Sequence, residues 1–349
     1  MTALRVLQVG SGREWRGGQN QVRLLCRELE REPAVEVRLV TKRGGELAAR
    51  AAADGVRVIE TGWTLGYDPR AWYTVGRQIE QFRPAVVHAH DSHALGVARR
   101  ALGRHAGALL ATRRVAFQLR WPSGWRRVDR VIAISDAVKR ALVSGGIAAA
   151  DISVVPSGID PDEVRAAAAS PLGIRARLGL APDTPLAVNV AALVDEKDQR
   201  TLVRAAAAAR ALQPDLHWAI AGDGELRGSL EAEIARLGLR DRVHLLGYVE
   251  HAAALITEGD VFVMSSKQEG LGSVILNALA LEKPVVATAG GGIPEILPPE
   301  ALVPVGDAEG LACKVVAVLT HPPSPFPLPP RFTAKAMAQG VLAVYRSLL

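Results

Sequence analysis

The sequence of 349 residues is 49% hydrophobic, 22% charged and only 4% aromatic, with a formal net charge of +6. This composition is typical of a globular protein with room for two hydrophobic cores, and it excludes disordered, fibrous and collagen-like classes. The two cysteines, Cys26 and Cys313, lie far apart in apparent helices, which excludes a disulfide framework and a zinc site of four thiolates. Because no long apolar run and no signal peptide are found, we expect a cytoplasmic protein that can make peripheral contact with the inner face of the cytoplasmic membrane.

Short apolar runs alternate with longer helical patterns through the first half of the chain. Seven of these runs are predicted strands, at residues 4–10, 35–40, 56–60, 85–90, 108–112, 130–135 and 152–156. A strand followed by a helix, repeated in this way, predicts a parallel sheet with helices on both faces.

The first half is also the basic half. Residues 1–165 hold 26 Lys and Arg against 17 Asp and Glu, a net charge of +9, whereas the remainder holds 16 against 19, a net charge of −3. This asymmetry indicates either an acidic partner, such as nucleic acid, an anionic membrane or a phosphorylated substrate, or a compositional bias toward arginine.

Six further strands are predicted in the second half, at residues 186–193, 217–224, 242–249, 261–266, 284–290 and 302–305. Residues 161–185, between the two sets, are typical of a helix, a turn and a linker, and we place the domain boundary there. Residues 322–330 are proline-rich and predict an extended connector before one last helix. Two doubly wound sheets in tandem predict a ligand in a cleft, where the carboxyl ends of the strands face each other.

The segment 265–297 carries the strongest candidate site. Glu269 follows a predicted strand, and Gly270 and Gly272 precede an apolar helix. Amide groups at a helix N-terminus bind phosphate, and a carboxylate beside them can stabilise a cationic sugar centre or accept from sugar hydroxyls. The alternative is that the glycines only allow close helix packing and that Glu269 is a solvated acid in the first turn.

This segment resembles the signature of the family 4 glycosyltransferases, which are retaining enzymes of the GT-B fold. The family motif has two glutamates separated by seven residues, then a strand and a Gly-Gly-x-x-Glu turn. Here Glu269 is followed by GLGSVIL and Asn277, and later by Gly291, Gly292 and Glu295. Asn277 stands where the family's second acid binds the nucleotide ribose, and an amide brings no charge, so we expect weakened nucleotide binding.

Other segments extend the resemblance over nearly the whole chain. Lys197 matches a lysine that holds the donor diphosphate in the family, whereas Ala192 stands where an arginine is usual. Gly17 and Gly18 match paired glycines that contact the donor phosphate, although a lone glycine pair is also typical of a flexible loop. The resemblance implies catalytic roles for Glu269 and His90 and donor binding by Gly17, Gly18, Lys197, Val249, Gly270, Leu271, Gly272, Ser273, Val274 and Asn277.

His88 and His90 lie two residues apart on one face of a predicted strand, with His90 at its carboxyl end. In the family a histidine at this strand end lines the reaction centre, and His90 matches it. Two other interpretations remain open: a metal site with Asp91 and His93, and a pair of structural histidines. Asp160 and Asp162 resemble a manganese-binding Asp-x-Asp pair, but their place before a helix favours capping.

Residues 111–130 are rich in arginine with aromatic side chains between. They predict either an acceptor-binding or membrane-contacting surface or a solvated loop. The candidate residues of this surface are Arg113, Arg114, Arg120, Trp121 and Trp125.

We therefore expect an α/β protein of the GT-B fold, with two tandem Rossmann-like doubly wound parallel-sheet domains facing across a cleft. The expected domains are an acceptor-side domain at 1–165, a nucleotide-sugar-binding domain at 175–325 and a helix at 331–349 that crosses back to the first domain.

The resemblance implies retaining, metal-independent transfer of a sugar from a nucleotide diphosphate donor to a hydroxyl of a glycolipid, polysaccharide or other cell-surface glycan, with no cofactor and no nucleic acid partner. The alternatives are a catalytically weakened nucleotide-sugar-binding protein, suggested by Ala192 and Asn277, and a GT-B sugar-nucleotide epimerase or phosphorylase.

Overall fold

The computed structural model describes residues 3–12, 15–64, 68–103, 107–119 and 124–349. The chain divides into two compact units, which are considered separately. The first unit comprises Met1–Ile159 and Pro330–Leu349, and the second comprises Asp160–Pro329.

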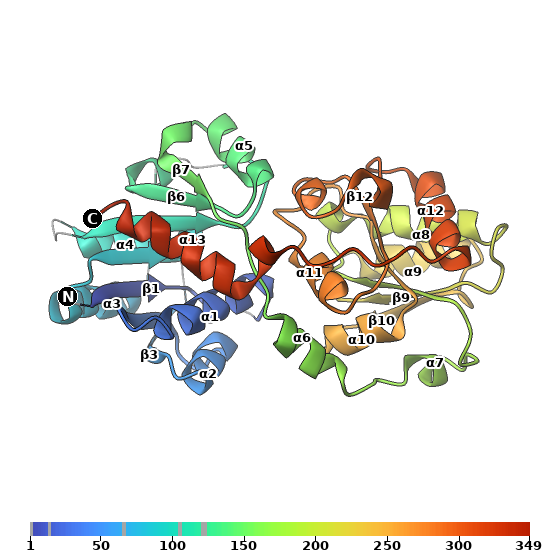
Figure 1. Cartoon of the computed structure of the whole chain (residues 1–349), viewed down its shortest axis with the longest axis horizontal. Helices are drawn as coiled ribbons and strands as arrows, with labels where there is room; N and C mark the ends of the chain where they lie inside the picture. The colour runs from blue at the N-terminus through green and yellow to red at the C-terminus, as the bar shows by residue number, and fades with distance from the viewer. Residues whose placement is uncertain (1–2, 13–14, 65–67, 104–106, 120–123) are drawn as a thin grey trace. The chain divides into compact units, whose positions relative to one another are not determined.

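The first unit contains a seven-stranded parallel sheet in the order β3-β2-β1-β4-β5-β6-β7 (Figure 1). All four residues of the central strand β4 are buried, as a sheet covered on both faces requires, and the continuous apolar runs of the sequence are thereby explained. The predicted strands are confirmed as β1 (Leu4–Val9), β2 (Val35–Lys42), β3 (Arg57–Thr61), β4 (Val86–Ala89), β5 (Ala108–Arg113), β6 (Arg130–Ala133) and β7 (Ile152–Val154).

Helices connect most of these strands, as the alternating pattern predicted, whereas the described part of the connection between β5 and β6 contains a 3-10 turn. They are α1 (Gly17–Glu30), α2 (Glu46–Ala53), α3 (Pro69–Phe82), α4 (Ser92–Leu102) and α5 (Asp136–Ser144), with short 3-10 turns η1 (Trp125–Arg127) and η2 (Ala149–Asp151).

The last helix, α13 (Ala334–Arg346), lies beside α1 in the first unit and is drawn in red in Figure 1. Its residues Met337, Val341 and Tyr345 are buried in the same hydrophobic cluster as side chains of α1 and of the sheet. These positions have the helical spacing that predicted one apolar face, and the first unit supplies the surface that this face covers.

Close backbone contacts join the returning chain to the end of the first stretch. The amide of Ile159 donates to the carbonyl of Phe332 (2.9 Å), and the amide of Ala334 donates back to the carbonyl of Ile159 (2.7 Å). A Cβ atom added to Gly158 would lie 2.2 Å from the carbonyl oxygen of Thr333, so only glycine allows this approach. The 3-10 turn η6 (Pro330–Phe332) immediately precedes the contact.

The boundary between the units lies earlier than the sequence predicted, between Ile159 and Asp160. The helix α6 (Pro161–Ala168) packs against α10 (Ala252–Glu258) and α11 (Ser273–Ala280) of the second unit. The carboxylate of Glu258 also accepts hydrogen bonds from the amides of Gly173 (3.0 Å) and Ile174 (2.6 Å). The segment predicted as a linker near residue 170 is therefore docked on the second unit.

The second unit contains a six-stranded parallel sheet in the order β10-β9-β8-β11-β12-β13. Its strands are β8 (Leu186–Val190), β9 (His217–Ala221), β10 (Val243–Gly247), β11 (Val261–Met264), β12 (Val285–Thr288) and β13 (Leu302–Val303). Its remaining helices are α7 (Ile174–Arg177), α8 (Gln199–Ala209), α9 (Arg227–Arg236) and α12 (Ala308–Thr320), with 3-10 turns η3 (Asp195–Lys197), η4 (Ile293–Glu295) and η5 (Pro299–Ala301).

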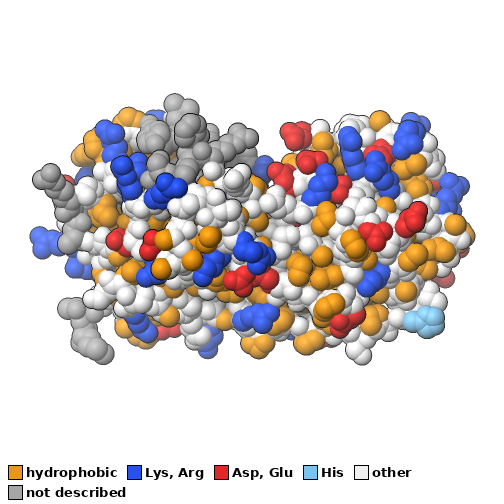
Figure 2. Space-filling model, turned by 90° about the horizontal axis from the view of Figure 1, so that it is seen from above, with side chains coloured by type: hydrophobic (Ala, Val, Ile, Leu, Met, Phe, Trp, Pro, Cys, Tyr) orange, Lys and Arg blue, Asp and Glu red, His pale blue; other side chains and the backbone are white. Residues whose placement is uncertain are grey.

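The described surface shows no continuous basic field on the face seen in Figure 2, where Lys and Arg side chains are interspersed with acidic and apolar ones. Within the described ranges, no helix has the length and apolar character needed to cross a bilayer.

Candidate active site

Two loops at the carboxyl edge of the second sheet bring Lys197 and Glu269 together. β8 and β11 are adjacent parallel strands, so the loops that follow them start at the same edge of the sheet. Lys197 ends the 3-10 turn η3 after β8, and Glu269 lies between β11 and α11. The hydroxyl of Ser265 donates to the carbonyl of Lys197 (3.0 Å) and fixes one loop against the other.

The Lys197 ammonium donates to Oε1 of Glu269 at 2.5 Å, and the hydroxyl of Ser266 donates to the same oxygen at 2.9 Å. The Glu269 side chain is 8% exposed and that of Lys197 is 25% exposed, so water reaches the pair from the lysine side. The sequence did not identify Ser266 as a partner of Glu269. A serine at the end of a strand is equally typical of a turn, and nothing in the local pattern shows that its hydroxyl donates to a carboxylate.

Glycines 290–292 hold the Glu269 loop by backbone contact. Added Cβ atoms on Gly290, Gly291 and Gly292 would lie 2.1 to 2.4 Å from carbonyl oxygens of the loop at residues 266–270. The amide of Gly292 donates to the carbonyl of Glu269 at 3.0 Å. The Gly-Gly part of the sequence motif therefore serves close approach of two loops, and the carboxylate of Glu269 is positioned by it.

The helix α11 begins directly after this loop. Gly272 has a positive φ of 89° at its N-cap, a conformation that glycine adopts without strain. Leu271 is buried, whereas Ser273, Val274 and Asn277 lie on the partly exposed side of the helix. Within the described structure, the Ser273 and Val274 amides donate to no protein acceptor, as is normal for the first turn of a helix. This N-terminus offers donors to an anion beside Glu269.

The Gly-Asp-Gly turn after β9 supports the loop that precedes Lys197. Added Cβ atoms on Gly222 and Gly224 would lie 1.8 Å from the carbonyl oxygen of Ala191 and 2.4 Å from that of Leu193. These two glycines therefore serve close backbone packing. Val249, which was predicted to bind donor, is partly buried and packs against the hydrophobic cluster on one face of the second sheet.

In the first unit His90 is buried and both of its ring nitrogens have partners. Nε2 lies 2.7 Å from Oε1 of Gln8, and the Arg114 guanidinium lies 3.1 Å from Nδ1 and donates to the His90 carbonyl at 2.9 Å. Burial, with smaller contributions from His88 and Arg114, lowers the pKa of His90 well below its usual value of 6.5. The ring is therefore neutral at physiological pH.

His88 is also buried, with Nδ1 2.6 Å from the hydroxyl of Tyr345 and Nε2 2.7 Å from that of Thr112. Burial and the charge of Arg114 lower the pKa of His88 to about 3. Its two nitrogens are thus engaged inside the core, and among the described residues no cluster of His, Cys, Asp and Glu could hold a metal ion. Tyr345 is 257 residues away along the chain, and no local sequence pattern could have indicated it.

The structure describes three residues of the predicted arginine-rich surface, Arg113, Arg114 and Trp125. Arg114 turns inward to His90, and Trp125 is buried. Arg113 lies over the rings of Phe117 and Trp125 and donates to the carbonyl of Phe117 (3.0 Å). Trp125 is therefore not part of an exposed surface, whereas Arg113 and Arg114 are partly buried and their predicted role stays a prediction. Arg120 and Trp121 lie outside the described residues.

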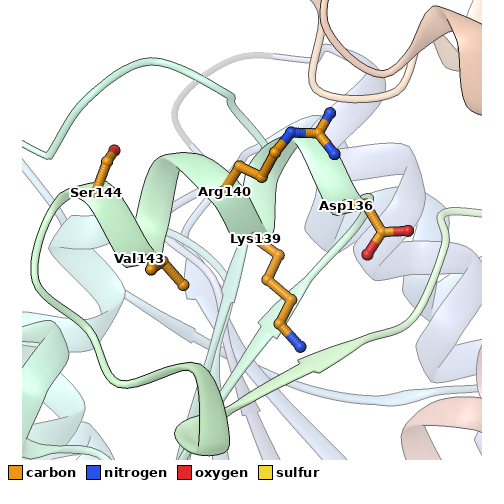
Figure 3. A pocket seen from close by; sticks show the side chains of 5 residues that line it. All are labelled: Asp136, Lys139, Arg140, Val143 and Ser144. Atoms are coloured by element: carbon orange, nitrogen blue, oxygen red, sulfur yellow. The ribbon is translucent and has the colours of Figure 1, made fainter.

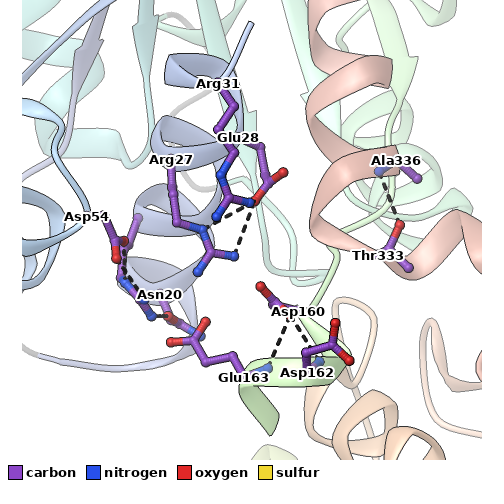
Figure 4. A network of polar contacts seen from close by, with 11 residues as sticks. Asn20, Arg27, Glu28, Arg31, Asp54, Asp160, Asp162, Glu163, Thr333 and Ala336 are labelled. Atoms are coloured by element: carbon purple, nitrogen blue, oxygen red, sulfur yellow. Dashed lines mark hydrogen bonds and ion pairs between the residues drawn. The ribbon is translucent and has the colours of Figure 1, made fainter. Parts of the chain in front are cut away.

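Asp160 caps α6, as its position before a proline predicted. Its carboxylate accepts from the amides of Asp162 (3.0 Å) and Glu163 (3.2 Å), as the dashed lines in Figure 4 mark. The Asp162 carboxylate instead accepts from Arg165 (3.0 Å). This arrangement satisfies the helix N-terminus and explains the Asp-x-Asp spacing without a metal ion.

A hollow of about 450 Å³ lies along α5 in the first unit (Figure 3). All of its described lining residues belong to that one helix: Asp136, Lys139, Arg140, Val143 and Ser144. None of the predicted site residues lines it, and side chains from a single helix do not converge on a ligand as those of an enclosed site do. We therefore place the candidate active site at the Lys197–Glu269 pair.

Comparison with known proteins gives matches for both halves of the chain. A family model described as glycosyl transferases group 1 matches residues 173–337, and one described as Glycosyltransferase Family 4 matches residues 15–163. A solved structure of Alr3699/HepE from Anabaena in complex with UDP-glucose superposes with a TM-score of 0.78 at 20% identity, over 99% of this chain and 98% of that one. The fold is thus that of the GT-B glycosyltransferases, with two parallel-sheet α/β domains.

Two curated relatives match by sequence. The 2-deoxystreptamine glucosyltransferase of Streptomyces kanamyceticus is 31% identical over 204 residues, which are 56% of this chain and 53% of the relative. A lipopolysaccharide core biosynthesis glycosyltransferase, LpsE, of Rhizobium meliloti is 35% identical over 142 residues, 40% of each protein. The matches thus span about half, or less, of the length of these relatives. With both family models matched, this chain belongs to the family 4 glycosyltransferases.

Proposed function

We propose that the chain transfers a sugar from a nucleotide diphosphate donor to an acceptor hydroxyl, with retention of configuration and without a metal ion. The observation that carries this proposal is the contact between Lys197 and Glu269 beside the N-terminus of α11. It combines a cation, helix amides and a carboxylate at one sheet edge. The cation and the helix amides can stabilise a diphosphate leaving group, and the carboxylate can stabilise a sugar carbon that becomes positive.

Without donor, the charge of the Lys197 ammonium is balanced by Glu269. In our proposal the ammonium turns to the donor diphosphate, and the amides of Ser273 and Val274 bind a phosphate oxygen. The freed Glu269 carboxylate, still held by Ser266, accepts from sugar hydroxyls and stabilises positive charge at the anomeric carbon. Asn277 binds the ribose through its amide.

The transfer step needs no protein nucleophile. The acceptor oxygen bonds to the anomeric carbon on the face from which the diphosphate departs, and the bond from that carbon to the phosphate oxygen breaks. The acceptor proton passes to the leaving phosphate oxygen, so atoms and charge balance. Attack on the same face retains the configuration.

The donor and acceptor proposals rest on the relatives. The Anabaena structure contains UDP-glucose, which makes UDP-sugars the first donors to test. One relative is named for lipopolysaccharide core biosynthesis, which supports a glycolipid, polysaccharide or other cell-surface glycan as acceptor. Peripheral contact with an anionic membrane and a cytoplasmic location belong to the same proposal.

A second candidate function is a nucleotide-sugar-binding protein with weak turnover. Ala192 and Asn277 support it, because they remove one cation and one carboxylate from the family pattern. Losing a charged hydrogen bond costs about 1.5–3 kcal/mol if nothing replaces it. Donor hydrolysis without an added acceptor, followed by mass spectrometry over a panel of nucleotide sugars, separates the two candidates.

Lys197→Ala tests the diphosphate site. We expect affinity for a nucleoside diphosphate to fall at least ~10-fold, the scale of a charged hydrogen bond, while affinity for the nucleoside alone is unchanged. Lys314→Ala, on α12, is the matched control in the same unit. Equal losses for both ligands would mean general damage to the unit. Activity abolished by EDTA and restored by Mn²⁺ would contradict the metal-independent mechanism.

A further inference from the structure

Lys197 and Glu269 have no other ionic partner among the described residues. Glu269 is the only acid at ion-pair distance from the Lys197 ammonium, and Lys197 is the only cation at that distance from the carboxylate. The carboxylate is buried and the ammonium is partly exposed. Water screens such a pair less than a pair at the open surface. Each group therefore competes strongly with any other ligand of its partner.

The backbone on both sides of this ion pair is fixed by contacts within the second unit. The amide of Lys267 donates to the carbonyl of Glu196 at 2.9 Å, which joins the two loops next to the pair. The hydroxyl of Thr288, at the end of β12, donates to the carbonyl of Ser266 at 2.7 Å. The pair can therefore open by rotation of the long, flexible Lys197 side chain, while the loops stay in place.

Ser266 provides a second donor to the oxygen that Lys197 occupies. Its hydroxyl lies 2.9 Å from Oε1 of Glu269, and the residue is fully buried. Within the described part of the chain, the protein donors to this carboxylate both end on Oε1, and Oε2 accepts from neither. When the ammonium turns away, the carboxylate keeps the hydrogen bond from Ser266. This bond lowers the cost of leaving a buried charge without its cation.

A diphosphate at the N-terminus of α11 and the Glu269 carboxylate attract the same ammonium. Lys197 has three donor hydrogens on a flexible stem, so it can turn from one anion to the other. An ammonium that bridged them would hold two anions side by side where water reaches from one side only, which is unfavourable. Binding of the diphosphate therefore breaks the ion pair, and re-formation of the ion pair favours release of the diphosphate.

We propose that Glu269 is an intramolecular competitor of the diphosphate for Lys197, and that this competition promotes release of the nucleoside diphosphate after sugar transfer. Ser266 is a positioning residue that holds Glu269 while the ammonium is turned away. The proposal rests on the proposed function, which supplies the diphosphate. Removing the charge of Glu269 thus strengthens binding of the product, although it lowers the rate of transfer.

Titration calorimetry of the full chain with inorganic pyrophosphate tests the competition, because this ligand has neither base nor sugar. We expect Glu269→Gln to bind pyrophosphate at least ~3-fold more tightly than the wild type, the scale of a partly exposed ion pair. Glu309→Gln removes the same charge from an exposed position on α12 and should stay within ~1.5-fold of the wild type. Binding by Glu269→Gln that is no tighter than wild-type binding would overturn the proposal.

Simple repulsion between Glu269 and the ligand would also make Glu269→Gln bind more tightly. The same substitution is therefore compared in a Lys197→Ala protein, where there is no ammonium to share. Competition for Lys197 predicts that the gain falls there to within ~1.5-fold, because the two substitutions then act on one interaction. A gain of full size without Lys197 would assign the effect to repulsion and overturn the proposal.

Ser266→Ala tests the positioning role. The carboxylate then depends on Lys197 alone, so opening of the ion pair costs more and pyrophosphate binding should weaken ~3-fold or more. In the Glu269→Gln protein the same substitution should change binding by less than ~1.5-fold, because no buried carboxylate has to be held. Equal losses in both proteins are expected from general damage to the loop and would overturn the positioning role.

The release step has its own readout. Exchange broadening in the phosphorus-31 NMR spectrum of pyrophosphate gives its dissociation rate constant, which should fall at least ~3-fold in Glu269→Gln and stay unchanged in Glu309→Gln. Tighter binding through faster association alone would overturn the role of Glu269 in release. These measurements need no turnover, so failure of sugar transfer and failure of this proposal remain distinguishable.

Discussion

At the scale of single residues, one oxygen of the Glu269 carboxylate accepts from two donors, the Lys197 ammonium and the Ser266 hydroxyl. Glu269→Gln keeps the size of the side chain and the contact with Ser266 but removes the negative charge. We expect a folded protein whose transfer rate is lowered at least ~100-fold, because charge stabilisation in the transition state is lost. Steady-state kinetics with the best donor checks this.

The matched control for this substitution is Glu309→Gln, an exposed acid in the first turn of α12. It removes the same charge from the same unit and should leave the rate unchanged. Near wild-type turnover by a folded Glu269→Gln protein would remove Glu269 from the proposed mechanism.

At Asn277 a substitution is expected to strengthen nucleotide binding. It lies on the partly exposed side of α11, where a carboxylate would be accessible to a ribose. Asn277→Glu should tighten nucleotide binding by roughly 1 kcal/mol, the difference between a neutral and a charged hydrogen bond. Calorimetry with a nucleoside diphosphate measures it, and no gain in affinity would place the ribose elsewhere.

Residues of the candidate site differ in how far the sequence could predict them. Glu269, Gly272 and Asn277 lie in one short segment, where a strand, a loop and a helix follow directly, so local pattern was enough. Arg114 was predicted on an acceptor-binding or membrane-contacting surface, and in the structure it is partly buried and donates to His90. The His90 ring that it contacts is held by Gln8, and Gln8 in turn contacts Tyr345, 337 residues along the chain; such contacts exist only after folding.

At the scale of elements, β4 and the residue that directly follows it place two buried neutral histidines, His88 and His90, in the core. The pKa of His88 is lowered to about 3 and that of His90 well below 6.5, in both cases mainly by burial. In the unfolded chain both titrate near 6.5, so between pH 6.5 and about 3 the unfolded state binds more protons. Stability of the first unit therefore falls as pH falls below 6.5, by up to about 1.4 kcal/mol per pH unit for each histidine.

Hydrogen exchange of the amides of β4 measures this pH dependence in the first unit alone. We compare the free energy of opening at pH 7 and pH 5 in the wild type and in His88→Gln, which cannot titrate. The variant should show a smaller loss between the two pH values. An identical loss in both proteins would assign the pH dependence to other groups.

The element boundaries show what local pattern determines and what packing determines. The strands were predictable because both faces of each sheet are covered, which leaves continuous apolar runs. The segment near residue 170 was interpreted as a linker because it is polar and has no regular spacing of apolar residues. The carboxylate of Glu258 accepts hydrogen bonds from amides of this segment and belongs to a helix more than eighty residues later. This contact docks the segment on the second unit, and no local pattern indicates it.

At the scale of the whole molecule, each unit has its own hydrophobic cluster. The cluster of the first unit includes α13, whose residues lie at the far end of the chain, while the main cluster of the second unit draws on α8 and α12. The first unit is therefore built from both ends of the sequence, and its folding requires residues that are joined to it through the entire second unit.

This organisation predicts that α13 stabilises one unit selectively. Met337→Ala removes a buried side chain from the cluster of the first unit and should cost about 2–4 kcal/mol, the usual effect of such a cavity. Leu311→Ala, buried in the second unit, is the reciprocal control with a loss of similar size. Hydrogen exchange should report loss of protection in the strands β1 to β7 for the first variant and in β8 to β13 for the second.

Deletion of residues 331–349 extends the same argument. It removes Tyr345 together with the apolar face of α13, so Gln8 and His88 lose their shared partner while α1 is uncovered. Protection should be lost throughout the first unit and retained in the second, where the site at Lys197 continues to bind nucleoside diphosphate. Loss of protection confined to the second unit would mean that the helix packs there in solution. Loss of nucleoside diphosphate binding by the truncated chain would contradict a nucleotide site contained in the second unit.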